Sequence, residues 1–370
     1  MTPFASGKIA DLAFIPGRLF SFPYGVVMKG RQWLYDAGIK RKDRLPCMVI
    51  SIGNLSMGGT GKTPHVIACA KYLLRKGYRP AVVTRGYGGR AGKGPLVVSD
   101  GEKMLVKPDV AGDEPCMMGE YLDGVPVMAG SDRYSGGMHA VREFGADTVI
   151  LDDGFQHISL ERDFDLVLMP VTSPVWKQRI FPGGELREPV SALAARASAL
   201  MITRSELTDR AGLEKTRKRL SGISCGVPVY SSRNEFSGFT DLYGNPVRTG
   251  RIREHRLLVV AAIGEPESLL SGIRNAGLEV KEAIFFRDHH RYTPNDIASI
   301  CQTAREKACQ YVVVTSKDAG KIKAIADYDA FNDNGIKFVV IHAKAFPEPG
   351  FWHFFDNFLQ NGTNRPSVSI

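Results

Sequence analysis

The chain has 370 residues, of which 44% are apolar and 24% are charged. This composition is that of an ordinary globular protein, so it excludes a chain that is disordered throughout, and the length predicts two to three domains. Lys and Arg outnumber Asp and Glu by 48 to 39, and the net charge of +9 indicates an anionic partner, such as nucleic acid, a membrane surface or a phosphorylated ligand.

Residues 1–44 hold much of that charge, with eight basic and three acidic side chains among many apolar ones. The longest uncharged run, residues 19–28, is ten residues long, whereas a membrane-spanning helix needs about 20. Asp11 and Arg18 also interrupt what would be the apolar region of a signal peptide. Two interpretations remain: a basic amphipathic segment that contacts a membrane surface, or a helix packed on the protein with a solvated basic face.

From residue 45 to residue 225, short apolar runs alternate with segments of helical periodicity. The runs expected to be strands are residues 48–53, 81–84, 95–99, 125–129, 148–151, 164–169 and 199–203. Residues 226–252 break this rhythm and are expected to form a β linker around a turn at residues 243–246. The alternation resumes over residues 253–370. We therefore expect an α/β fold with two three-layer α/β/α domains, of which the second is smaller.

A glycine-rich turn, GNLSMGGTGKT at residues 53–63, joins the first strand to a helix. Glycines let successive backbone N–H groups surround an anion, and the helix N-terminus adds partial positive charge. Lys62 can reach the β- and γ-phosphates of a nucleotide, and the Thr63 hydroxyl can bind Mg²⁺. Ser56 stands where the P-loop consensus has glycine, and the glycines that follow it supply the flexibility. The turn predicts a P-loop NTPase-like domain over residues 45–225.

Carboxylates occur at two further positions that suit a phosphate site. Asp152 and Asp153 follow an apolar strand. Ligands bind at the carboxyl ends of parallel strands, so these residues are placed to hold Mg²⁺ beside the phosphates. Asp113 and Glu114 follow a glycine, and they suit either a base with a metal ligand or the acidic first turn of a helix.

Two loops and a histidine pair carry polar groups without an obvious structural need. Arg85 lies within TRGYGG after a strand, and Arg187 lies in a loop within LREP. Each either brings a cation to an anionic substrate or belongs to a solvated loop. His289 and His290 follow Asp288 after a strand, and this group is a metal pair, an acid/base unit or a surface turn.

In chain order, the stretches GNLSMGGTGKTP, TRGYGG, GDEP, ILDDGFQH, LREP and RDHH resemble tetraacyldisaccharide 4'-kinase, the lipid A 4'-kinase family of Gram-negative bacteria. TSKDAGK at residues 315–321 resembles a TEKDAVK-type stretch of the family, with Ser316 where members commonly have Glu. The resemblance implies two α/β/α domains joined by a short β linker. It also implies a kinase that uses ATP and Mg²⁺ to phosphorylate the 4'-hydroxyl of a tetraacylated glucosamine disaccharide 1-phosphate, which gives lipid IVA in lipopolysaccharide biosynthesis.

The resemblance further implies roles for individual residues. Asp113 would be the general base and His289 its partner, with Lys62 on the phosphates. The ATP loop would comprise Ser56, Met57, Gly58, Gly59, Thr60, Gly61, Lys62 and Thr63. Mg²⁺ and the phosphates would lie among Thr63, Glu114, Asp152 and Asp153. Positions on the substrate or phosphate side would be Arg85, Tyr87, Arg133, Arg187 and Glu188.

A lipid substrate favours the membrane interpretation of residues 1–44, and the resemblance implies a peripheral protein at the cytoplasmic face of the inner membrane. Two alternative functions are a membrane-associated nucleotide switch and a P-loop ligase that activates a carboxylate. A switch would account for the P-loop and the basic segment but not for GDEP, LREP and RDHH. Nucleic-acid binding is not expected, because the basic residues mix with apolar ones and form no recognisable reading module.

Overall fold

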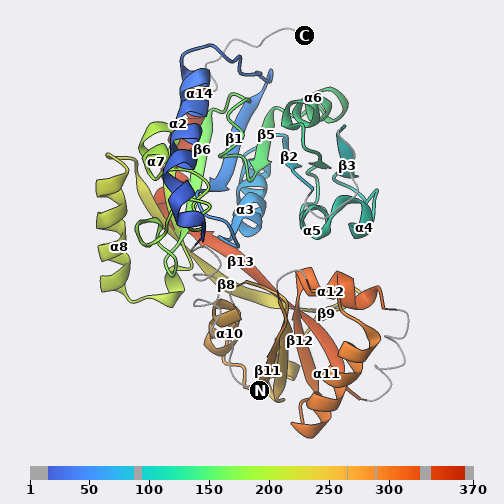
Figure 1. The fold of residues 1–370 in the computed structure, drawn as a ribbon. Helices are drawn as coiled ribbons and strands as arrows, with labels where there is room; N and C mark the ends of the chain where they lie inside the picture. Colours follow the sequence, from blue (N-terminus) through green and yellow to red (C-terminus); the bar gives the residue numbers. More distant parts are fainter. Residues whose placement is uncertain (1–15, 87–93, 265, 288–289, 326–334, 363–370) are drawn as a thin grey trace.

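The computed structural model describes residues 16–86, 94–264, 266–287, 290–325 and 335–362. Within these ranges, residues 16–228 and 349–362 form an N-terminal lobe and residues 242–336 form a C-terminal lobe (Figure 1). Two long strands join the lobes, β8 (Val229–Asp241) and β13 (Lys337–Pro347), and we call them the interlobe ribbon. One sheet runs through both lobes in the order β11-β10-β12-β13-β8-β7-β6-β1-β5-β2-β4-β3, with β9 paired to β8.

The parallel strands of the N-terminal lobe come from the apolar runs of the sequence. They are β1 (Met48–Asn54), β2 (Pro80–Thr84), β4 (Val127–Ala129), β5 (Thr148–Asp152), β6 (Phe164–Pro170) and β7 (Ala199–Thr203). Nearly all of their residues are buried, as expected for strands covered on both faces. β3 (Leu96–Ser99) lies antiparallel to β4 at the edge, where Pro95 predicts it. The predicted α/β sheet is confirmed.

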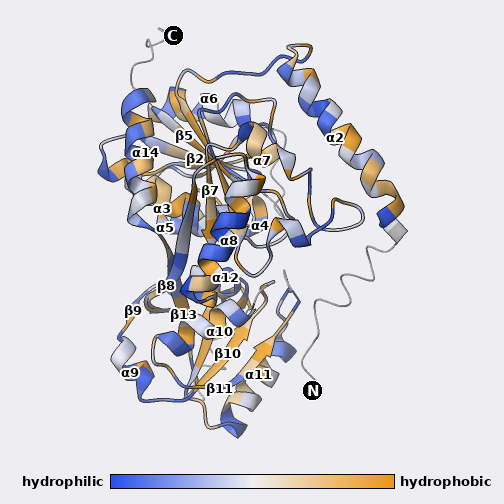
Figure 2. Cartoon of the chain, turned by 90° about the vertical axis from the view of Figure 1, so that its left-hand side faces the viewer, coloured by the Kyte–Doolittle hydropathy of each residue, from blue (hydrophilic) through white to orange (hydrophobic). Residues whose placement is uncertain are grey.

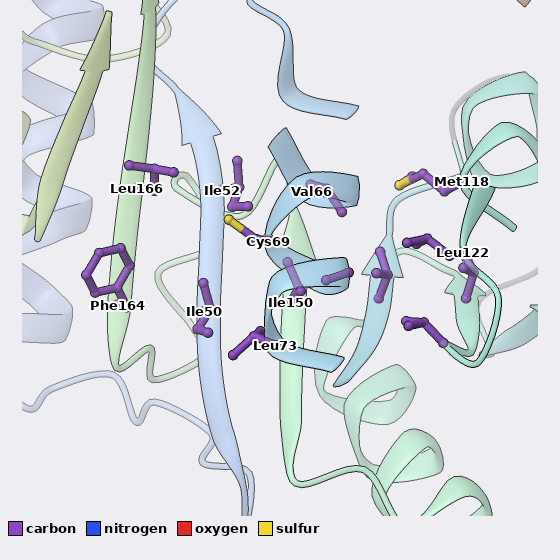
Figure 3. Close-up of a cluster of buried hydrophobic side chains, with 14 of the residues drawn as sticks. Ile50, Ile52, Val66, Cys69, Leu73, Met118, Leu122, Ile150, Phe164 and Leu166 are labelled. Carbon is purple, nitrogen blue, oxygen red and sulfur yellow. The ribbon is translucent and has the colours of Figure 1, made fainter. Parts of the chain in front are cut away.

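Helices lie on both faces of this sheet. Outermost is α2 (Ser21–Asp36), which follows a 3-10 helix (Pro16–Phe20) and lies along the outside of the lobe (Figure 2). The others are α3 (Lys62–Arg75), α4 (Pro108–Ala111), α5 (Asp113–Tyr121), α6 (Arg133–Phe144), α7 (Ser191–Arg196) and α8 (Arg210–Ile223), with 3-10 turns at Val175–Lys177 and Ser205–Leu207. Val66 and Leu73 of α3 are buried with Ile52 of β1 in the main core cluster (Figure 3). This packing fixes the helix that follows the phosphate loop.

The C-terminal lobe repeats the pattern on a smaller scale. Its strands are β10 (Leu257–Ala261), β11 (Val280–Phe285) and β12 (Tyr311–Thr315), which run parallel to one another and to β13. Its helices are α9 (Thr249–Arg253), α10 (Pro266–Asn275), α11 (Pro294–Glu306) and α12 (Ser316–Lys323). α11 begins at a capping box, in which Thr293 and Asp296 each bond the other's backbone N–H.

The interlobe ribbon includes a second long strand, β13, that lies outside the linker predicted over residues 226–252. β8 starts parallel to β7 and then runs antiparallel to β13, and β9 (Pro246–Val247) returns against β8 after a turn at Gly244. β13 extends beyond its pairing with β12 at residues 337–341, and its second half pairs with β8 alone. The pairing shifts register between His342 and Ala343, opposite Gly238, whose φ is 136°.

The last helix, α14 (Pro349–Gly362), crosses back to the N-terminal lobe. By chain order it belongs to the predicted domain of residues 253–370, but in the structure Phe351, Phe355 and Leu359 are buried in the core cluster of the N-terminal lobe. The ring of Phe355 lies 5.1 Å from that of Phe164 on β6. The aromatic face of α14 therefore covers apolar surface of the N-terminal sheet, which a domain boundary drawn by chain order does not anticipate.

Replacing Phe355 by Ala should lower the free energy of unfolding by about 3–5 kcal/mol, because the substitution leaves a cavity in a closed core. Guanidinium denaturation of the full chain measures this loss. Asn357→Ala, on the exposed face of the same helix, is the matched control and should change stability by no more than about 0.5 kcal/mol. Equal effects of the two variants would contradict the core position of α14.

Candidate active site

Two features shape the phosphate loop: the backbone conformation of its glycines and a backbone hydrogen bond at its start. Gly58 and Gly61 have φ values of 99° and 86°, a left-handed backbone that other residues rarely adopt, and Gly61 immediately precedes α3. At the base of the loop, Met57 N donates a hydrogen bond to Glu185 O over 2.8 Å. The chain is therefore held in extended pairing up to Met57, and residues 58–63 curve around the N-terminus of α3.

Asp152, at the carboxyl end of β5, is buried beside the loop. Its Oδ2 accepts a hydrogen bond from Thr84 Oγ1 (2.8 Å), and its carbonyl oxygen accepts one from Arg133 Nη2 (3.1 Å). Burial and the nearby Glu114 carboxylate raise the pKa of Asp152 to about 6, against the lowering effect of Lys62. No side chain or backbone group among the described residues donates a hydrogen bond to its Oδ1. This buried oxygen is therefore open to a cation.

Asp153 holds two cations at the edge of the loop. Its backbone adopts a φ of 53°. Its Oδ1 lies 3.5 Å from Lys62 Nζ, and its Oδ2 accepts a hydrogen bond from Arg187 Nη1 over 2.7 Å. Burial alone would raise the pKa of Asp153, but Lys62 and Arg187 together lower it below its ordinary value. Because both oxygens face cations, the carboxylate positions Lys62 and Arg187, and its part in holding Mg²⁺ stays a prediction.

A cavity of about 490 Å³ lies over the loop and between the two lobes. The predicted residues that line it are Gly58, Gly59, Thr60, Gly61, Lys62, Thr63, Arg85, Asp113, Glu114, Asp152, Asp153 and Arg187. Ile263, Gly264 and Lys317 of the C-terminal lobe line it as well. The cavity thus combines a phosphate loop, several basic side chains and several carboxylates, and both lobes contribute to it.

Asp113 is the first residue of α5, as the helix interpretation of GDEP predicts, and it also lines the cavity, where its role as a base stays a prediction. Its Oδ2 lies 3.3 Å from Lys321 Nζ of α12, and the two side chains are only 28% and 15% exposed. This ion pair crosses from one lobe to the other. It holds the Asp113 carboxylate at the boundary between them.

Other predicted residues lie outside this cavity: Ser56, Met57, Arg133 and Glu188. Glu188 is buried, and its two oxygens accept hydrogen bonds from Gln156 Nε2 (2.9 Å) and Arg196 Nη2 (2.6 Å). Arg133 is buried and donates to the backbone oxygens of Gly130 and Asp152. Both charged residues therefore brace the loops behind the cavity, and the substrate-side or phosphate-side roles predicted for them stay predictions.

The histidine pair is only partly visible. His289 and Tyr87 lie outside the described residues. His290 Nε2 lies 3.1 Å from Asp296 Oδ2, and its ring stacks on Phe286 at 4.4 Å. His290 is thus held by the start of α11, and the role predicted for His289 stays a prediction.

Residues 15–360 match the family model described as tetraacyldisaccharide-1-P 4'-kinase, LpxK. This chain belongs to the LpxK family. It is 36% identical to the tetraacyldisaccharide 4'-kinase of Syntrophus aciditrophicus, over 93% of this chain and 92% of that protein. It is also 36% identical to the tetraacyldisaccharide 4'-kinase of Halothermothrix orenii, over 86% and 85% of the two chains. A crystal structure of LpxK from Aquifex aeolicus in complex with ATP superposes with a TM-score of 0.73 at 28% identity, covering 95% of this chain and 98% of that one.

Sequence reasoning missed several residues at this LpxK-family site. Asn54 Oδ1 lies 3.4 Å from Lys62 Nζ, and Arg204 Nη2 donates to Gly59 O over 2.6 Å. Arg204 directly follows the apolar run at residues 199–203, so its position at the carboxyl end of a parallel strand was a usable signal. Lys317 and Lys321 lie in the TSKDAGK stretch that resembles the family, but local sequence does not place them at the cavity, because only the packing of the lobes brings α12 there.

The residues present fit Mg²⁺ held together with a nucleotide. Mg²⁺ prefers oxygen ligands and usually keeps several waters, so one or two protein groups suffice beside the phosphates. Asp152 Oδ1 is buried without a donor, and Thr63 and Glu114 line the same cavity. Across the described part of the chain there is no cluster of three His, Cys, Asp or Glu side chains that would hold a metal by itself. An ion shared with phosphate oxygens suits this donor set.

His65 should make the stability of this LpxK-family member depend on pH. The residue is buried one turn into α3, its Nδ1 lies 2.8 Å from Gly61 O, and burial lowers its pKa from 6.5 to about 4. Below pH 6.5 the unfolded chain binds a proton that the folded protein refuses until about pH 4, so stability falls as the pH falls through this window. The loss is about 3 kcal/mol at 1.36 kcal/mol per pKa unit.

Urea unfolding of the wild type and of His65→Gln at pH 7, 5.5 and 4 measures this loss. The glutamine variant keeps a donor near Gly61 but cannot titrate, so the difference in unfolding free energy between the two proteins should shift in favour of the variant as the pH falls. Parallel pH profiles would show that His65 is not held neutral.

Proposed function

We infer that this chain is an ATP-dependent 4'-kinase that phosphorylates the 4'-hydroxyl of tetraacyldisaccharide 1-phosphate in lipid A biosynthesis. The observation that carries this conclusion is the interlobe cavity, which the phosphate loop of residues 58–63 lines together with Asp113 and several basic side chains. Membership of the LpxK family supplies the substrate. ATP and Mg²⁺ are the cofactors.

Charge neutralisation is the chemistry that this cavity suits. Phosphoryl transfer passes through a loose transition state, so the protein contributes mainly position and positive charge. Lys62 and Arg187 are held by Asp153, and Arg85 lines the same cavity. Mg²⁺, when bound, neutralises further charge on the phosphate oxygens. The ion pairs with Asp153 fix the two cations before a nucleotide arrives, which reduces the reorganisation that binding requires.

Asp113 is proposed as the group that receives the proton of the attacking hydroxyl. Its carboxylate lines the cavity and is oriented by Lys321 over 3.3 Å. A base in this reaction takes the proton late, so reach matters more than a strongly raised pKa. His289 is proposed as its partner on the family pattern alone.

Incubating the protein with Mg-ATP and an acylated glucosamine disaccharide 1-phosphate should yield a product heavier by one phosphate group, as read by mass spectrometry. Lys62→Ala and Asp113→Asn should each lower turnover by about 100-fold, which corresponds to roughly 2.7 kcal/mol of barrier. Lys218→Ala and Asp123→Asn, at exposed positions on α8 and after α5, are the matched controls and should keep wild-type turnover. Absence of product from protein that binds ATP would refute the kinase, and near-normal turnover of Asp113→Asn would remove it as the base.

The second part of the proposal concerns α2, which we propose rests on the membrane surface at the cytoplasmic face of the inner membrane. Phe22, Val26 and Trp33 lie on one helical face and are 81%, 54% and 61% exposed. Tyr24 Oη donates to Arg187 O over 3.1 Å, so the helix is attached to the loop that carries Arg187. Burying an aromatic side chain contributes about 1.5–3 kcal/mol, and each nearby basic residue adds about 1 kcal/mol at an anionic surface.

Among the helices that the structure describes, none combines the length and the apolar character needed to cross a membrane.

The double variant Phe22→Asn/Trp33→Asn should lower binding to vesicles of phosphatidylethanolamine and phosphatidylglycerol at least tenfold, because it removes two exposed aromatic side chains from one face of α2. Co-sedimentation measures bound protein. Leu105→Asn, which replaces an apolar side chain that is 46% exposed on another part of the lobe, should bind as the wild type does. Unchanged binding of the double variant would show that α2 is not the contact.

A further inference from the structure

A hydrogen-bonded cluster joins the two lobes away from the phosphate loop. Tyr121 Oη, at the end of α5, contacts Ser316 Oγ at 2.8 Å and His342 Nδ1 of β13. His342 Nε2 in turn lies 2.8 Å from Thr240 Oγ1 of β8. We call these four residues the interlobe cluster. It connects the N-terminal lobe, the first residue of α12 and both strands of the interlobe ribbon.

The cluster stands at the irregular point of the ribbon. The β8–β13 pairing shifts register directly after His342, opposite Gly238. Gly238 has a φ of 136°, a backbone conformation that a residue with a side chain rarely adopts. Irregular pairing of this kind bends a strand pair and leaves backbone groups unpaired. Side-chain bonds from Tyr121 and Thr240 hold His342 at that point.

Tyr121 and Ser316 form one end of a helix pair whose other end is at the active site. Tyr121 ends α5 and Ser316 begins α12, whereas Asp113 begins α5 and Lys321 lies in the last turn of α12. The contacts Tyr121–Ser316 and Asp113–Lys321 therefore show that α5 and α12 lie side by side and run in opposite directions. The packing of α12 against α5 determines where Lys321 lies relative to Asp113. It also decides where Lys317, four residues earlier on the same helical face, enters the phosphate cavity.

The cluster borders solvent-accessible space and is not part of a hydrophobic core. Tyr121, Ser316, Thr240 and His342 line an interlobe cavity of about 660 Å³, which Asp113 and Lys317 also line. Removing one hydroxyl here leaves no void in a packed interior, so the cost to global stability is small. Its consequence is for the relative position of α5 and α12.

We propose that Tyr121, Ser316 and His342 are positioning residues for the phosphoryl transfer. They fix α12 against α5 and so set Lys321 at Asp113 and Lys317 at the phosphate cavity. The proposal rests on the proposed function for its effect on turnover, and on geometry alone for its effect on α12. A displacement of about 1 Å in a charge that stabilises the transition state can lower a rate by up to 100-fold, whereas ATP binding depends on the phosphate loop, which the cluster does not touch.

Tyr121→Phe removes the central hydroxyl and keeps the ring. Turnover should fall about tenfold while the KM for ATP stays within about twofold, since the lost interaction acts in the transition state. Ser316→Ala should lower turnover similarly, and Ser316→Thr, which keeps a hydroxyl, should restore it. The double variant Tyr121→Phe/Ser316→Ala should be no slower than the slower single variant, because each substitution removes the same contact between Tyr121 and Ser316. Tyr72→Phe, which loses a hydroxyl bonded to Asp356 within the N-terminal lobe, is the matched control.

Hydrogen exchange of the α12 backbone gives a readout that does not need activity. Tyr121→Phe should speed exchange in residues 316–323 about tenfold and leave α11 unchanged. Unchanged turnover or multiplying effects in the double variant would overturn the positioning role. If the wild type lacks kinase activity, the proposed function fails. The hydrogen-exchange experiment still applies in that case, and unchanged exchange in α12 would show that the interlobe cluster does not fix α12 against α5.

Discussion

The carboxylate of Asp153 is the point on which the active site depends. One oxygen faces Lys62, which opens α3, and the other faces Arg187, which comes from a loop far away in the sequence. Both ion pairs are largely buried, so removing either partner leaves an uncompensated charge beside the phosphate loop. The backbone oxygen of Arg187 also accepts a hydrogen bond from the Tyr24 hydroxyl, and this contact attaches α2 to the same loop. The phosphate loop and the helix on the outside of the lobe are therefore linked by direct contacts.

The two lobes divide the work at this site. The N-terminal lobe supplies the anion cradle, because its parallel strands end together and α3 begins there. The C-terminal lobe supplies Lys317 at the cavity and Lys321 opposite Asp113. Side chains of both lobes therefore line the same cavity. The N-terminal lobe alone would lack Lys317 and Lys321, so the cavity needs both lobes for its full set of charged side chains.

Local patterns predicted the parts of the site that local structure determines. The phosphate loop needs glycines between a strand and a helix, and Asp152 and Asp153 end a strand, so both are visible as short stretches of sequence. The sequence alone cannot place Glu188 and Arg133, because a charged residue in a loop looks the same whether it faces a substrate or a buried partner. Only folding brings Arg196 and Gln156 to Glu188. The amphipathic pattern of α14 likewise predicts a buried face but not the surface that buries it.

Because α14 packs on the N-terminal lobe, this lobe cannot finish folding during synthesis until the C-terminal lobe has been translated. Tyr72 on α3 bonds Asp356 on α14 across 284 residues of chain, and Phe164 packs under the same helix. While the ribosome is still making the C-terminal lobe, the sheet of the first lobe has an uncovered apolar face, a kind of surface that promotes aggregation. The C-terminal lobe is in effect an insertion between β8 and α14, and the first lobe is completed only after α14, which follows the C-terminal lobe in the chain, has been translated.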